Sequence, residues 1–109
     1  MKYTISLNQQ PTLHGVRPAV DFLFRSLARV AEKRVVAAVL TGMGRDGCDG
    51  AVELRKAGCW VVAQDEKTSV VFGMPKAVIE AGAADDIKPL GLIGEALRKQ
   101  LFKLKILPT

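Results

Sequence analysis

The chain has 109 residues, of which 49% are hydrophobic and 25% charged, a balance typical of one globular domain and not of a disordered chain. Sixteen basic and eleven acidic residues give a formal net charge of +5. No apolar run approaches the roughly 20 residues that cross a bilayer, and the polar first ten residues lack the apolar core of a signal peptide. We therefore predict a cytoplasmic protein without membrane insertion.

Two elements are predicted before residue 35. Residues 3–7 alternate weakly between apolar and polar side chains, which predicts a short strand. Pro18 suits a first helical position, and the apolar residues after it are spaced by three and four, which predicts an amphipathic helix with Asp21 in its first turn. These apolar residues are Val20, Leu23, Phe24, Leu27, Val30 and Ala31.

The middle of the chain predicts a strand, a helix and a second strand. Residues 35–40 and 60–63 are short unbroken apolar runs, which are typical of strands covered on both faces. Between them lie a glycine-rich loop over residues 41–47 and a short helix over residues 48–57, which Gly58 ends. This order predicts one parallel βαβ unit.

The last third of the chain predicts a helix, an edge strand and a helix. Pro75 opens a short helix that Gly82 ends, residues 86–88 predict the strand, and apolar spacing predicts the final helix over residues 92–104. The alternation of helices and buried strands predicts an α/β fold. We expect a single domain over residues 1–109, with three layers and a mostly parallel, Rossmann-like sheet that has helices on both faces.

The glycine-rich loop is the strongest candidate for chemistry, because open α/β sheets bind ligands at the carboxyl ends of their strands. Gly42, Gly44 and Gly47 spell G-x-G-x-x-G, and Asp65 closes the next strand 18 residues beyond Gly47. This pattern fits a dinucleotide site. Asp46, however, would then face the pyrophosphate as an unpaired like charge, so a dinucleotide-binding module is the less favoured alternative.

Asp46 has two interpretations at this point. A carboxylate on a strand-to-helix turn can hold a catalytic histidine in its tautomer, or it can cap the helix that follows, for about 1 kcal/mol. The N–H groups of such a loop also attract an anion or a developing oxyanion. The residue chemistry by itself leaves both interpretations open.

Several blocks of the sequence resemble one family. Residues 40–47, Leu-Thr-Gly-Met-Gly-Arg-Asp-Gly, resemble the signature of the chemotaxis methylesterases, the CheB family. Residues 16–24 resemble that family's R-P-S-V-D segment, with Ala19 in place of the serine, and residues 63–66 and 70–75 are similar to two further blocks in the same order. The resemblance covers about residues 15–98 and corresponds to the C-terminal half of the family's catalytic domain.

The resemblance implies a serine esterase that hydrolyses glutamate methyl esters on chemoreceptors, or deamidates glutamines there. It implies that Asp46 is the aspartate of a Ser-His-Asp triad. It also implies that the backbone N–H of Met43 belongs to the oxyanion hole, within a loop shaped by Gly42, Gly44 and Gly47. No cofactor is implied.

The serine and the histidine of the family belong to segments that this sequence does not match. Its own Ser6, Ser26, Ser69 and His14 stand outside any G-x-S-x-G elbow and are interpreted as solvated or turn residues. We therefore expect the chain alone to be inactive, and we keep a non-catalytic interaction module of the same fold as the alternative. The expected partners are chemoreceptors, together with either a second copy in a homodimer or a chain that bears the missing half.

The cysteines and the basic residues have structural interpretations. Cys48 and Cys59 lack zinc-type spacing, so they are interpreted as buried thiols and no metal is expected. Four basic residues near the end of the chain are interpreted as the solvent-exposed face and last turn of a helix. Because no aromatic residues are interleaved with them in a stacking pattern, we expect no nucleic-acid partner. The four basic residues are Arg98, Lys99, Lys103 and Lys105.

Overall fold

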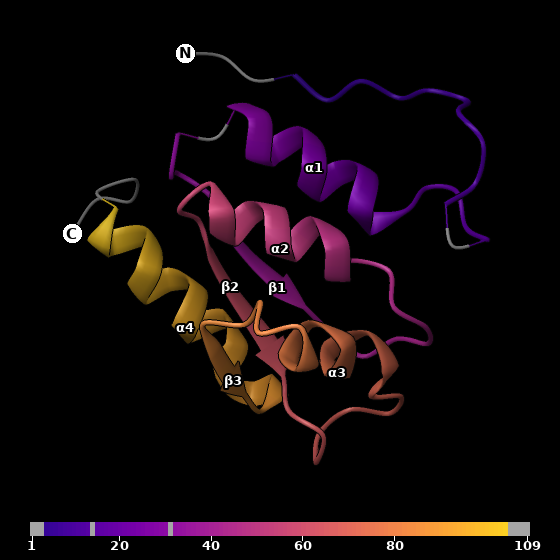
Figure 1. The fold of residues 1–109 in the computed structure, drawn as a ribbon. Helices are drawn as coiled ribbons and strands as arrows, with labels where there is room; N and C mark the ends of the chain where they lie inside the picture. The colour runs from indigo at the N-terminus through magenta and orange to yellow at the C-terminus, as the bar shows by residue number, and fades with distance from the viewer. Residues whose placement is uncertain (1–3, 14, 31, 105–109) are drawn as a thin grey trace.

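The computed structural model describes residues 4–13, 15–30 and 32–104, which form a parallel three-stranded sheet and four helices. In chain order the elements are α1 (Val20–Val30), β1 (Val36–Val39), α2 (Cys48–Lys56), β2 (Trp60–Gln64), α3 (Gly73–Glu80), β3 (Asp86–Lys88) and α4 (Leu90–Lys103) (Figure 1). Within these described ranges, no helix is both long enough and apolar enough to cross a bilayer.

The sheet has the order β1-β2-β3, with both pairs parallel. Val36 lies opposite Trp60 in the first pair, and Val62 lies opposite Asp86 in the second. Parallel neighbours need a crossover connection, and α2 and α3 provide the two crossovers. The predicted βαβ unit is therefore present and is followed by a second one.

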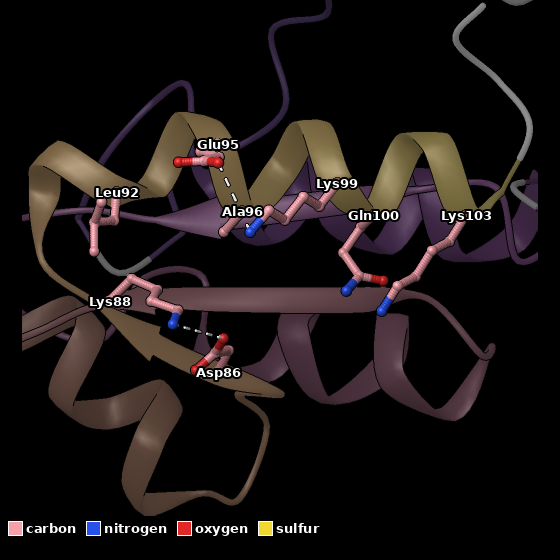
Figure 2. Close-up of a pocket in the computed structure, with 8 residues that line it drawn as sticks. All are labelled: Asp86, Lys88, Leu92, Glu95, Ala96, Lys99, Gln100 and Lys103. Atoms are coloured by element: carbon pink, nitrogen blue, oxygen red, sulfur yellow. Dashed lines mark ion pairs between the residues drawn. The ribbon is translucent and has the colours of Figure 1, made fainter. Parts of the chain in front are cut away.

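Helices cover both faces of this sheet, as predicted. The helices α2 and α3 pack on one face, where Leu54, Val61 and Val78 form the centre of the main core with almost no exposed surface. The helix α4 contacts all three strands from the opposite face, where Val62 and Ile93 are buried (Figures 1 and 2). The chain therefore has three layers, and the carboxyl ends of β1 and β2 meet at one edge.

The first helix, α1, packs mainly on α2 and lies beside it in Figure 1. Phe24 is its buried anchor in the core. The predicted apolar stripe is only partly covered, because Leu23 and Val30 remain 55% and 47% exposed. The periodicity thus identified the helix, but α2 covers only part of its apolar face.

The predicted strand over residues 3–7 is wrong for the residues described. Residues 4–7 are not in a strand, and the side chains of Ile5 and Leu7 are about nine-tenths exposed. An alternating segment becomes a strand only when a neighbour takes up its backbone hydrogen bonds. Residues 4–7 pair with none of the three strands, so their backbone hydrogen bonds are not taken up by the sheet in the part of the chain that the structure describes.

Smaller differences concern the helix ends. The helix predicted from Pro75 begins two residues earlier, at Gly73, and the final helix begins at Leu90. Cys48 and Cys59 are free and buried, as predicted. Arg98, Lys99 and Lys103 lie on the exposed side of α4, where Lys99 pairs with Glu95; Lys105 lies outside the described residues.

Candidate active site

The candidate site is the loop that joins β1 to α2, at the carboxyl edge of the sheet. Gly44 and Gly47 have φ angles of 85° and 94°, which favour glycine because a Cβ atom is strained in this region. These two residues let the chain turn from the end of the strand into α2. Asp46 stands between them and is almost buried, with 9% of its surface exposed.

The Asp46 carboxylate is anchored by the start of α1. One oxygen accepts the backbone N–H of Val20 at 2.7 Å, and the other accepts the N–H of Asp21 at 3.0 Å. Free N–H groups and the positive end of the helix dipole both favour a carboxylate here. Asp46 is thus a helix cap, but it caps α1 and not α2, whose own N-cap residue is Gly47 and has no side-chain cap.

A second carboxylate, that of Asp21, makes the reverse contact, from α1 to the start of α2. Asp21 is fully buried, and its Oδ1 accepts the backbone N–H of Gly50 in the first turn of α2 at 2.7 Å. Its sequence interpretation as a first-turn acid is correct in position, but the side chain serves the neighbouring helix. The starts of the two helices are therefore held together by two buried carboxylates.

The front of the loop is clamped by the segment that leads into α3. The N–H of Gly42 donates to the carbonyl of Val71, and the carbonyl of Gly42 accepts the N–H of Met74, both at 2.9 Å. A side chain at Gly73 would come within 3.0 Å of the Gly42 carbonyl oxygen. The N–H of Gly42 is therefore used in the fold, and Met74 packs on the core.

The N–H of Met43 differs from that of Gly42, because it donates to no group among the described residues. The Met43 side chain is also 83% exposed. An N–H group without a protein partner in a rigid loop is a candidate donor for a developing oxyanion. The same loop thus presents a fixed carboxylate at Asp46 and an unused donor at Met43.

The buried side-chain amide of Gln64 holds the start of this loop. Gln64, at the end of β2, is 1% exposed. Its Oε1 accepts the N–H of Thr41 at 2.8 Å, and its Nε2 donates to the carbonyl and hydroxyl of Thr68 at 2.9 and 3.2 Å. Gln64 was not predicted from the sequence. It could have been recognised as a polar side chain at the end of an apolar strand, because a buried polar group there needs hydrogen-bond partners.

The other polar candidates have local structural roles. Asp65 accepts hydrogen bonds from the N–H and the hydroxyl of Thr68, within its own turn. The hydroxyls of Ser26 and Ser69 donate to the carbonyls of Leu23 and Asp65. Ser6 is exposed on the N-terminal arm, and His14 lies outside the described residues. The structure therefore joins Asp46 to Met43 and the glycines, and not to these serines.

A shallow pocket of about 270 Å³ lies on the other side of the molecule, between α4 and the edge of β3 (Figure 2). Its charged side chains largely neutralise one another, with Lys88 paired to Asp86 and Lys99 paired to Glu95. It contains none of the loop residues. Among the residues described, no group of three or more His, Cys, Asp or Glu side chains is placed to hold a metal ion.

The comparisons with known proteins agree on one family. The sequence profile of the family described as CheB methylesterase matches residues 1–97. A protein-glutamate methylesterase/protein-glutamine glutaminase of Bdellovibrio bacteriovorus is 50% identical over 99 residues, which are 91% of this chain and 28% of that protein. One of Pyrococcus horikoshii is 52% identical over 98 residues, which are 90% of this chain and 27% of that protein.

A solved structure is similar over most of the chain. The crystal structure of the Thermotoga maritima CheB methylesterase catalytic domain superposes with a TM-score of 0.81 at 44% sequence identity, covering 84% of this chain and 48% of that one. The chain thus spans about a quarter of the length of the curated relatives and about half of the solved catalytic domain.

Proposed function

Because the chain belongs to the CheB methylesterase family, we propose that it supplies the aspartate and the oxyanion donor of a Ser-His-Asp hydrolase site. The substrates are glutamate methyl esters, or glutamine side chains, on chemoreceptors. The chain corresponds in this proposal to the C-terminal part of the catalytic domain. The serine and the histidine come from a complementary segment.

One observation carries the proposal, namely the fixed and nearly buried carboxylate of Asp46. Each of its oxygens accepts one hydrogen bond from α1, and a carboxylate oxygen has two acceptor sites. Asp46 therefore keeps acceptor capacity for the N–H of a histidine. Because the helix start holds the carboxylate in place, it can orient an imidazole and stabilise the imidazolium that forms.

The reaction then follows the general triad scheme. The histidine takes the proton of the serine hydroxyl, and the serine oxygen attacks the ester carbonyl while the N–H of Met43 donates to the oxyanion. The histidine then gives this proton to the leaving group, so that collapse of the intermediate releases methanol from an ester, or ammonia from a glutamine, and leaves an acyl-serine. Water, activated by the same histidine, hydrolyses this bond to give the glutamate side chain and restores the serine.

The complementary segment needs a surface to bind, and we place it beside α1 and β1. One edge of β1 has no strand partner among the residues described. Phe22, Leu23 and Val30 of α1 are exposed apolar side chains. Open strand edges and apolar patches recruit another polypeptide. In the absence of the complementary segment, a second copy is the proposed occupant, in a two-fold homodimer.

The cytoplasm is the compartment that we propose for this chemistry. Both cysteines are free and buried, as suits a reducing compartment, where structural disulfides are rare.

The proposal is tested by reconstitution. The chain is mixed with a segment of a related catalytic domain that carries the serine and the histidine, and methanol release from a glutamyl methyl ester is measured. We expect hydrolysis by the mixture and none by either part alone, because the nucleophile and its base must lie within hydrogen-bond reach. Asp46→Asn should lower kcat by roughly 10³- to 10⁴-fold, because the amide favours the wrong histidine tautomer.

Asp49→Asn is the matched control, since Asp49 is three residues away and its carboxylate is 44% exposed in surface ion pairs. It should leave the rate unchanged. Robust hydrolysis by the chain alone, or full activity of the Asp46→Asn mixture, would overturn the proposal. A mixture that binds tightly but hydrolyses nothing would favour the alternative, a non-catalytic interaction module.

A further inference from the structure

Two buried carboxylates each accept backbone N–H groups at the start of the neighbouring helix, one at α1 and one at α2. Asp46 precedes α2 and accepts the N–H groups of Val20 and Asp21 in α1. Asp21 belongs to α1 and accepts the N–H of Gly50 in α2. Each helix therefore depends on the other for part of the capping at its first turn, because the N-cap residue of α2 is a glycine without a side chain.

We propose that Asp21 is the positioning residue for Asp46. This inference rests on the proposed function of Asp46 as the triad aspartate. The Asp46 carboxylate takes its direction from two N–H groups of α1, and Asp21 holds that end of α1 against α2. A shift of α1 moves both donors together and turns the carboxylate, because no other hydrogen bond to it is made within the residues described.

The packing around the contact is tight enough for this role. A Cβ atom at Gly50 would lie 2.5 Å from the Cβ of Phe24 and 3.0 Å from Oδ1 of Asp21. The two helix starts therefore approach at van der Waals distance, and there is little room for one helix to slide along the other. Asp21 is fully buried, and it acts through the donors that it keeps in place.

Amide hydrogen exchange on the full chain tests the inference directly. The reporter is the N–H of Val20, because its intrinsic exchange rate does not change when residue 21 is replaced. In Asp21→Ala we expect exchange at Val20 to rise about tenfold more than at the core amides of Val61 and Val62, which report the global stability. Asp21→Asn should restore the Val20 rate, because its Oδ1 still accepts the N–H of Gly50.

A general loss of stability alone gives a different result, since it raises exchange at Val20 and in β2 by the same factor. That outcome, or an unchanged Val20 rate in a folded Asp21→Ala chain, would overturn the inference. If Asp21→Ala does not fold, Asp21→Ser is measured in its place, because the shorter side chain is too far from Gly50 to accept its N–H.

Activity provides the second readout. In the reconstituted enzyme, Asp21→Ala should lower kcat about tenfold with KM unchanged, and Asp21→Asn should recover most of the loss. An active enzyme in which Asp21→Ala keeps full kcat would sink the inference while the proposed function survives. If wild-type chain is inactive in every mixture, the proposed function fails, and the exchange rate at Val20 still decides whether Asp21 positions Asp46.

Discussion

Gln64 is a buried side chain that links two loops at the carboxyl edge of the sheet. Its side chain joins the start of the glycine loop, at Thr41, to the loop after β2, at Thr68. The hydroxyl of Thr68 in turn accepts the N–H of Leu90 at the start of α4, and the hydroxyl of Thr41 accepts the N–H of Val71. One buried amide therefore links the segments that follow all three strands.

Replacing Gln64 should destabilise the chain without a change in side-chain size. Gln64→Leu leaves the N–H of Thr41 without its acceptor and the carbonyl of Thr68 without its donor, which costs about 1–3 kcal/mol. The free energy of unfolding is measured by urea denaturation. Gln9→Leu on the exposed N-terminal arm is the control and should change it by less than about 0.5 kcal/mol. Equal values for the two variants would show that the Gln64 network contributes nothing.

At the level of the helices, α2 and α4 each contain a glycine where alanine is normally the better residue. Gly50 of α2 faces α1, and an added Cβ atom would meet Phe24 and Asp21. Gly94 of α4 is exposed and has no atom within 4 Å of the position of a Cβ atom. Replacement of glycine by alanine should therefore have opposite effects on stability at these two positions.

We expect Gly94→Ala to raise the free energy of unfolding by about 0.5–1 kcal/mol, because alanine loses less conformational entropy in a helix. Gly50→Ala should lower it by about 1–3 kcal/mol, because the added methyl forces α1 and α2 apart. Both are measured by chemical denaturation under the same conditions. Stabilisation by Gly50→Ala would mean that the two helices are not in contact at this point.

At the scale of the whole molecule, apolar side chains are exposed on more than one face, and α1 carries several of them. Leu23 and Val30 of α1 are about half exposed, and β1 lies at an edge of the sheet. This is the side where we place the complementary segment. A second apolar group, Leu92 on α4, lies on the opposite face of the sheet and is 48% exposed.

Sedimentation equilibrium at micromolar concentration should show dimers of the chain alone and a one-to-one complex when the complementary segment is added. Leu23→Glu should shift the chain to monomer and weaken the complex, because it puts a charge into the apolar contact. Leu92→Glu, the control on the other face, should do neither. A monomeric chain that binds no apolar dye would contradict the proposed surface.

The sequence by itself determined the order and type of nearly every element, and the place of the candidate site. Apolar spacing, the short buried runs and the glycine loop are local signals, since they depend on neighbours within one turn or one strand. For the same reason the blocks that resemble the methylesterases could be identified without coordinates. The arm over residues 3–7 shows the limit, because alternation is local but a strand needs a partner.

Only the tertiary structure decided what the polar side chains do. Asp46 caps a helix that begins 26 residues earlier in the chain, Asp21 reaches an N–H 29 residues later, and Gln64 reaches Thr41 across 23 residues. Such partners are set by the packing of α1 on α2 and by the pairing of β1 with β2. A carboxylate satisfied by distant backbone N–H groups has the same local sequence as one that caps its own helix, so the choice belongs to the fold.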